Sequence, residues 1–174
     1  MITKHSIRIL VVLLFMAAWT RMAHADMKHR FGVGAHYWVT ADDIEFDNID
    51  EDGFAWLVSY QLRPVMLLKF EVALEMLPDN FGGATEQVFA PQAYAIVGGW
   101  IYAGLGIGAL YSDGEFSDEP FYALRAGFDF PILPHIHVDI NANYRFIEWD
   151  SIGSLDEDLD TDTITVGAAV RIQI

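Results

Sequence analysis

Apolar and polar residues alternate with a period of two along most of this chain. In residues 136–146 every even position is apolar and every odd position is polar or charged. Successive side chains of a β-strand point to opposite faces, so this segment predicts a strand with one apolar face and one charged face. The same alternation predicts eight strands, at residues 30–39, 54–63, 66–76, 87–97, 100–111, 121–131, 136–147 and 163–174. The predicted fold class is therefore all-β.

The connections between these strands alternate in length. Residues 63–65, 98–99 and 133–135 are short connections, whereas residues 40–53, 77–86, 112–120 and 148–162 are long ones. Short turns at one end and long loops at the other are typical of bacterial outer-membrane barrels. With an even number of strands, both chain ends fall on the short-turn side. Pro91 blurs the fourth strand, because proline cannot donate to a ladder, and a β-bulge is expected there.

The two faces of the predicted strands differ sharply in chemistry. One face is apolar and carries no charge, while the other mixes charged residues with many glycines. An eight-stranded barrel has an interior that side chains can fill, and glycine makes room there for long charged side chains. We therefore expect a lumen network, with Asp139 close to Arg171 on the neighbouring strand. The expected network consists of Arg30, Arg63, Lys69, Glu71, Glu75, Arg125, Asp129, Asp139, Arg145 and Arg171.

Charges are also separated along the chain. The four long connections contain 20 of the 25 acidic residues and no Lys or Arg. A charged face that was merely solvated would be expected to mix both signs across faces and loops, so the separation favours charges paired inside a lumen. The alternative is a soluble barrel of lipocalin type, which would bury the apolar face and bind a ligand in the periplasm. That face holds more large residues than a small interior could take.

The N-terminal segment has the features of an export signal. Lys4 and Arg8 precede an apolar run at residues 9–19, and Ala23-His24-Ala25 fits a small-residue cleavage site. We expect residues 1–25 to be removed, which leaves a barrel domain at 26–174 and lowers the net charge from −15 to −18 with the loss of Lys4, Arg8 and Arg21. This charge disfavours nucleic acid as a partner. The chain contains no cysteine, so neither a disulfide nor a thiolate metal site can form.

Taken together, the signal segment, the eight alternating strands, the loop asymmetry and the last strand at residues 163–174 resemble the small eight-stranded outer-membrane barrels, the OmpA/OmpX-like class. The resemblance implies a closed antiparallel up-and-down transmembrane barrel in the outer membrane of a Gram-negative cell. It implies extracellular long loops, periplasmic termini, and outer-membrane lipid, lipopolysaccharide and the barrel-assembly machinery as partners of a monomer. Members of this class serve as envelope structure, adhesins, narrow pores or lipid A enzymes, so the fold does not choose among these roles.

The acidic loops are candidates for binding divalent cations. Closely spaced carboxylates can hold Ca²⁺ or Mg²⁺, although neither loop matches a full calcium-binding pattern. The candidates for loosely bound cations are Asp50, Glu51, Asp52, Asp156, Glu157, Asp158 and Asp160. No other cofactor is expected. A solvated, repulsive surface and diffuse cation bridging to lipopolysaccharide are the other interpretations.

Candidates for catalysis are few. His137 and Asp139 share the charged face, but they lie at the short-turn end, and His36 is the one histidine toward the long-loop end. The segment 104–108 has alternating glycines inside a strand, with no helix after it, and so is not a phosphate loop. We therefore expect a plugged, salt-bridged lumen with a structural or surface-interaction role and no enzymatic activity. A narrow ion-conducting pore and a lipid A-modifying enzyme are the alternatives.

Overall fold

The eight alternating segments close into a single β-barrel. The computed structural model describes residues 27–40, 52–79, 81, 86–112, 114–117, 119–147 and 163–174. The strands are β1 (Lys28–Thr40), β2 (Asp52–Val65), β3 (Leu68–Leu77), β4 (Val88–Gly98), β5 (Ile101–Gly108), β6 (Tyr111–Ser112), β7 (Glu115–Phe116), β8 (Phe121–Leu133), β9 (Ile136–Phe146) and β10 (Thr163–Gln173). The eight predicted strands are confirmed, with ends that differ from the predicted ends by at most three residues. No helix in the described part of the chain is long and apolar enough to cross a membrane.

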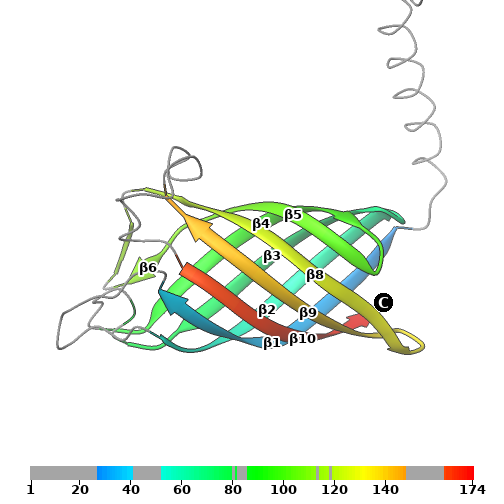
Figure 1. Cartoon of the computed structure of the whole chain (residues 1–174), viewed down its shortest axis with the longest axis horizontal. Helices are drawn as coiled ribbons and strands as arrows, with labels where there is room; N and C mark the ends of the chain where they lie inside the picture. The colour runs from blue at the N-terminus through cyan, green and yellow to red at the C-terminus, as the bar shows by residue number, and fades with distance from the viewer. Residues whose placement is uncertain are drawn as a thin grey trace, which may run out of the picture.

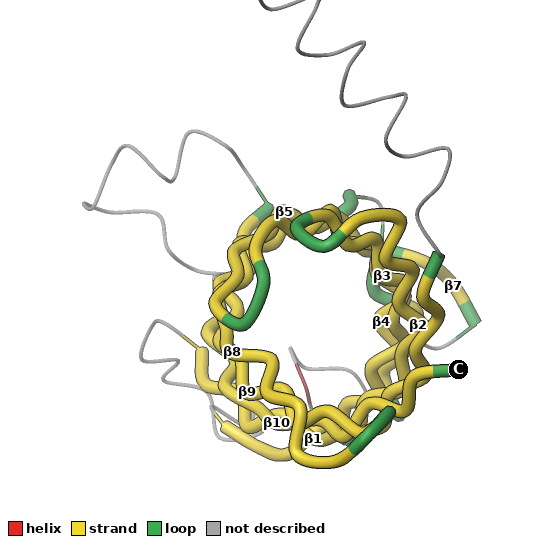
Figure 2. The backbone as a smooth tube through the Cα atoms, turned by 90° about the vertical axis from the view of Figure 1, so that its right-hand side faces the viewer, coloured by secondary structure: helices red, strands yellow, loops and turns green. Residues whose placement is uncertain are grey.

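Every long strand pairs antiparallel with its two neighbours around a ring. The order is β3-β2-β1-β10-β9-β8-β5-β4, and pairing of β3 with β4 closes the ring. The first strand pairs with the whole of the last one, from Arg30 opposite Gln173 to Thr40 opposite Thr163. Figure 1 shows the tilted strands from the side, and Figure 2 shows the closed ring of strands viewed along the barrel. The predicted class, a closed eight-stranded antiparallel barrel, is confirmed.

The short connections occupy one end of the barrel. Two of them need a left-handed backbone: Gly98 has φ of 124° before the β4–β5 turn, and His135 has φ of 67° in the β8–β9 turn. Glycine adopts such a conformation without steric cost, whereas histidine does so less readily. We call the end of the barrel with these short connections the short-turn end. The opposite end, toward residues 40 and 52, is the long-loop end.

The expected bulge at Pro91 is wrong. The β3–β4 register runs unbroken through Leu74 opposite Pro91, and Pro91 contributes its carbonyl oxygen to a hydrogen bond from Ala109 at 3.1 Å. The register shifts instead between Leu62 and Val65 and between Pro131 and Leu133, both at the short-turn end. Proline is therefore accommodated in β4 without a register shift, and β5 ends nearby at Gly108.

The apolar face points outward and the charged face points inward. Phe31, Val33, Phe54 and Ile101 expose 54–71% of their surface, whereas all the inward charged residues except Arg63 are almost fully buried. Phe146 departs from the expected pattern, because it is 1% exposed and its ring lies 5.8 Å from that of Tyr144. The soluble-barrel alternative requires the opposite arrangement of faces.

Candidate functional site: the charged interior

The inward side chains of the barrel form successive layers along its axis, and the inward residues of β3 show the order of these layers. Lys69, Glu71, Glu75 and Leu77 follow one another from the short-turn end to the long-loop end, and all are fully buried. A strand points alternate side chains to one face, so this single strand contributes to each layer. Each layer is centred on a carboxylate, apart from the last, which is apolar.

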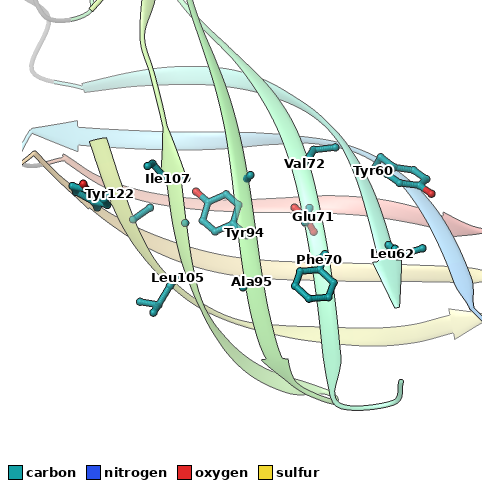
Figure 3. Close-up of a pocket in the computed structure, with 13 residues that line it drawn as sticks. Tyr60, Leu62, Phe70, Glu71, Val72, Tyr94, Ala95, Leu105, Ile107 and Tyr122 are labelled. Carbon is teal, nitrogen blue, oxygen red and sulfur yellow. The ribbon is translucent and has the colours of Figure 1, made fainter. Parts of the chain in front are cut away.

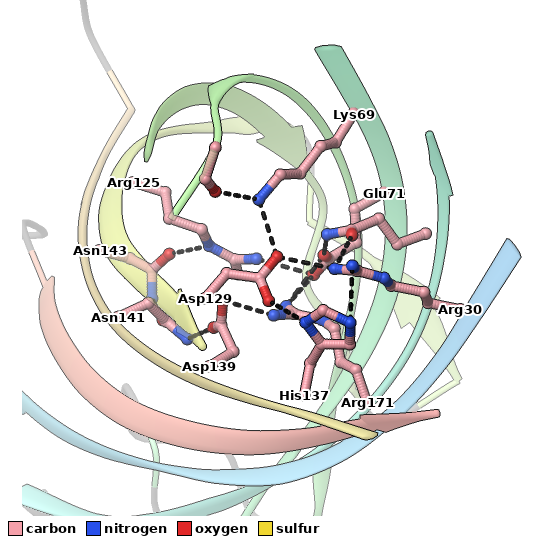
Figure 4. A network of polar contacts seen from close by, with 12 residues as sticks. Arg30, Lys69, Glu71, Arg125, Asp129, His137, Asp139, Asn141, Asn143 and Arg171 are labelled. Carbon is pink, nitrogen blue, oxygen red and sulfur yellow. Dashed lines mark hydrogen bonds and ion pairs between the residues drawn. The ribbon is translucent and has the colours of Figure 1, made fainter. Parts of the chain in front are cut away.

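The first layer surrounds Asp129 on β8. Its carboxylate accepts hydrogen bonds from Arg30 Nη1 at 2.7 Å and Lys69 Nζ at 2.9 Å, and it lies 3.0 Å from His137 Nδ1 (Figure 4). Arg30 Nη2 lies 2.9 Å from His137 Nε2. Since arginine can only donate, Nε2 accepts and Nδ1–H donates to Asp129, which assigns a neutral imidazole. We call these four residues the Asp129 cluster.

The second layer surrounds Glu71. Its carboxylate accepts hydrogen bonds from Arg125 at 2.8 Å, Arg171 at 2.9 Å and the Gln61 amide at 2.8 Å. These partners come from β8, β10 and β2, so the layer ties strands from different parts of the barrel wall. The Arg125 guanidinium also lies over the Tyr94 ring, 3.7 Å from its centroid, which is a cation–π contact.

A ladder of polar side chains extends this second layer along β9. Arg171 forms an ion pair with Asp139, the partner expected from the sequence. Asp139 accepts a hydrogen bond from Asn141 at 2.7 Å, and Asn141 accepts one from Asn143 at 2.9 Å. Asn143 in turn accepts from Arg125, which closes the circuit back to Glu71. We call the set of Gln61, Glu71, Arg125, Asp139, Asn141, Asn143 and Arg171 the Glu71 cluster.

The third layer surrounds Glu75. Its carboxylate is 2.7 Å from His36 Nδ1, accepts from Gln92 Nε2 at 3.1 Å, and forms an ion pair with Arg145. The Tyr94 hydroxyl donates to Gln92 Oε1 at 2.6 Å and so connects this layer with the one below. We call His36, Glu75, Gln92 and Arg145 the Glu75 cluster.

An apolar cap covers the polar layers at the long-loop end. Trp38 and Phe81 pack edge to face with ring centroids 4.7 Å apart. Phe81 comes from the connection between β3 and β4, while the rest of the cap comes from strands. The buried members are Trp38, Ala55, Leu77, Phe81, Val88, Ala90 and Phe121.

The structure brings nine of the ten predicted lumen residues into ion pairs. Arg63 is the exception: its Nη2 donates to the Met66 carbonyl at 2.9 Å, and it forms no ion pair with any described residue. Gln61, Gln92 and Tyr94 also belong to the network, although the sequence did not predict them there. Strict alternation from Ser59 would have found Gln61, whereas Pro91 obscured the phase of β4.

The candidate cation ligands fall almost wholly outside the described residues. Asp52 alone is described, and it accepts a hydrogen bond from the Tyr37 hydroxyl across the β1–β2 pair. Asp50, Glu51, Asp156, Glu157, Asp158 and Asp160 lie in segments that the structure does not describe. Among the described residues, no group of three or more His, Asp or Glu side chains could hold a metal ion. The proposed cleavage of residues 1–25 also lies outside the described part.

The outer wall is not uniformly convex. A shallow groove of about 640 Å³ runs over β4, where Ala93 and Ala95 are small (Figure 3). Large outward side chains line its sides, among them Tyr60, Phe70 and Leu105. This surface is apolar, as expected of a wall in contact with lipid acyl chains.

Solved structures with the same architecture come from Gram-negative bacteria. Neisserial surface protein A aligns with a TM-score of 0.52 at 15% identity, over 85% of this chain and 97% of that one. The N-terminal β-barrel domain of Pseudomonas aeruginosa OprF aligns with a TM-score of 0.53 at 8% identity, over 84% and 97%. The outer membrane protein OprG from the same organism gives 0.50 at 11%, over 86% and 97%. No family model and no curated protein matches the sequence. The chain has the fold of the small eight-stranded outer-membrane barrels.

Proposed function

We propose that this protein is an integral outer-membrane barrel with a closed interior and a structural or surface-interaction role. The observation that carries the proposal is the stack of three carboxylate-centred layers under an apolar cap. Buried ions are tolerated when they are paired and hydrogen-bonded, and each of the four interior carboxylates contacts at least one cation. Such a filled interior supports a plug rather than a water-filled channel.

The barrel also has a proposed orientation in the outer membrane. The long loops face the cell exterior and the short turns face the periplasm, as is usual for outer-membrane barrels. Lipid covers the apolar wall, and a monomer is sufficient because closure of the ring leaves none of its eight long strands with a free edge. The barrel-assembly machinery and lipopolysaccharide are the remaining proposed partners.

Conductance across a planar lipid bilayer tests the plug. The folded protein is expected to give no discrete current steps in concentrated KCl, because the charged side chains and the cap fill the lumen. Insertion must be checked in the same preparation by protease protection of the barrel. Reproducible unitary steps from inserted protein would overturn the plug and establish the narrow pore.

We also propose that the acidic loops bridge to lipopolysaccharide through divalent cations. The support is their composition, with many carboxylates and no Lys or Arg in the four connections. Oxygen ligands of this kind suit Ca²⁺ and Mg²⁺. Chelation of Ca²⁺ in vesicles that contain lipopolysaccharide is expected to speed proteolysis of the loops. Equal cleavage rates with and without Ca²⁺ would contradict this bridging.

The proposal assigns no catalytic role to the interior histidines. His36 and His137 each contact a carboxylate that also binds an arginine, and both lie within the polar layers. This arrangement supports a role in filling and pairing the lumen. Mass spectrometry of lipid A from cells with and without the gene checks this: an unchanged lipid A is expected, and a gene-dependent change would establish the enzymatic alternative.

A further inference from the structure

The inward face of the barrel carries more positive charge than its carboxylates can balance. Seven Lys and Arg residues lie on this face or at its rim, against four carboxylate side chains. Glu75 pairs with Arg145, Glu71 and Asp139 pair with Arg125 and Arg171, and Asp129 pairs with both Arg30 and Lys69. The excess therefore lies at the short-turn end.

Two cations at that end have no carboxylate partner among the described residues. They are Lys28 and Arg63, which lie directly opposite each other in the β1–β2 register. Like charges in directly opposed positions of a sheet destabilise the pair. Lys28 is exposed at the rim, whereas Arg63 is partly buried.

Arg63 also has unused hydrogen-bonding capacity. Its Nη2 donates to the Met66 carbonyl at 2.9 Å, and its Nε is buried without a hydrogen-bond partner among the described residues. Arg63 is near enough to Arg30 and Lys69 to repel both of them electrostatically. Because the Asp129 carboxylate is shared by Arg30 and Lys69, it cannot also balance Arg63.

An unpaired cation in such a place is costly, and an anion between Lys28 and Arg63 would remove the cost. Guanidinium matches phosphate well, because its planar array of donors forms two parallel hydrogen bonds with two phosphate oxygens. Strand ends lie at the membrane boundary, where lipid headgroups are located. Behind the rim, Arg30 and Lys69 share the single carboxylate of Asp129, so these three groups keep one net positive charge that adds to the positive potential.

We propose that Arg63 and Lys28 form a phosphate-binding site at the short-turn end of the barrel, with Arg30 and Lys69 supplying additional positive potential. The phosphate is either that of a glycerophospholipid headgroup or free inorganic phosphate. In the orientation proposed above, this end faces the periplasmic leaflet. The site itself does not depend on that orientation or on the plug.

Thermal unfolding of the folded protein in an uncharged sugar detergent tests the site. Sodium phosphate is compared with sodium chloride at equal ionic strength, because a ligand that binds only the folded state raises the unfolding temperature. A rise of about 5 °C or more is expected where phosphate exceeds its Kd a hundredfold. In a second arm, mixed micelles contain either phosphatidylglycerol or a fatty acid of equal charge.

Substitutions at the rim test whether the phosphate-dependent rise in unfolding temperature depends on Arg63 and Lys28. Arg63→Gln and Lys28→Gln are each expected to lose most of the phosphate-dependent rise, and Arg63→Lys is expected to lose more than half of it. Lys28→Gln changes an exposed rim residue, so it tests the proposal even if Arg63→Gln fails to fold. Arg145→Gln removes the same charge near the long-loop end; its unfolding temperature without phosphate is expected to fall, because Glu75 loses its cation, but the phosphate-dependent rise is expected to remain complete.

Each outcome decides the proposal. Stabilisation by both phosphate and phosphatidylglycerol supports a site for the phosphate group itself, and stabilisation by phosphatidylglycerol alone supports a lipid headgroup as the ligand. Equal stabilisation by the fatty acid would show a response to charge only and would overturn a phosphate site. No stabilisation by either probe, or an undiminished rise in both rim variants, would overturn it as well.

Discussion

Glu71 shows how much depends on single side chains in this interior. It is fully buried, and it accepts hydrogen bonds from Gln61, Arg125 and Arg171, which lie on three other strands. Removal of one partner from a buried ion pair leaves the other charge without compensation. Loss of the Glu71 carboxylate is therefore expected to destabilise the folded barrel strongly, because its buried cationic partners would remain.

Glu71→Ala is expected to lower the free energy of unfolding by about 3–5 kcal/mol, because it leaves Arg125 and Arg171 with less counter-charge. Urea unfolding of the refolded protein in detergent measures this loss. The matched control is Glu115→Ala, which removes an exposed carboxylate of β7 and is expected to change the free energy by less than about 0.5 kcal/mol. Equal effects of the two substitutions would contradict the role given to Glu71.

Among the strands, β5 is distinctive because three of its inward residues are glycines, Gly104, Gly106 and Gly108. A Cβ at Gly106 would collide with the Tyr94 ring of the neighbouring strand. Tyr94 in turn lies under Arg125, whose guanidinium stacks on its ring. Small residues in β5 thus make space for the large side chains that join the second and third layers.

Gly106→Val is expected to destabilise the barrel by about 1–3 kcal/mol, because the new side chain would displace Tyr94 from beneath Arg125. Ala103→Val adds two methyl groups on the outward face of the same strand and is expected to be close to neutral. The midpoint of urea unfolding distinguishes them. A Gly106→Val protein as stable as wild type would show that the interior can repack around β5.

The strands and their faces follow from the sequence because alternation is a local signal that each strand carries by itself. Two features of the structure could not be predicted from this alternation. The apolar cap was missed because Trp38, Leu77 and Phe121 lie on the face that is charged elsewhere, and alternation gives the face of a residue but not its depth in the barrel. The tolerance of Pro91 was missed because it depends on how β4 pairs with β3 and on where β5 ends, which is tertiary information.

Considered as a whole molecule, the barrel exposes a continuous apolar belt and encloses its charges. Leu105 and Ile107 on β5 and Ile140 on β9 expose about half of their surface, while Arg125 and Asp139 on the inner face are almost fully buried. A soluble protein rarely exposes an apolar surface of this extent. Lipid or detergent is the solvent that such a wall requires.

Outer-membrane fractions run on detergent gels test this arrangement of faces. The unboiled protein is expected to migrate differently from the boiled protein, because the closed ring of backbone hydrogen bonds resists detergent until it is heated. The expected shift in mobility depends only on the strands that form the barrel and not on the structure of the loops. Recovery of the protein in the soluble periplasmic fraction, with no mobility shift, would invert the two faces and favour a ligand-carrying barrel.

Pairing of β1 with β10 brings together residues as far apart as Arg30 and Gln173, whose side chains are 143 positions apart in the chain. This seam gives the barrel a high contact order, so folding is expected to be slow and strongly cooperative. Until β10 arrives, β1 and β9 each present an unpaired edge, and such edges recruit other chains. The moment of greatest risk for aggregation therefore comes just before the ring closes, when seven of the eight strands are already in place.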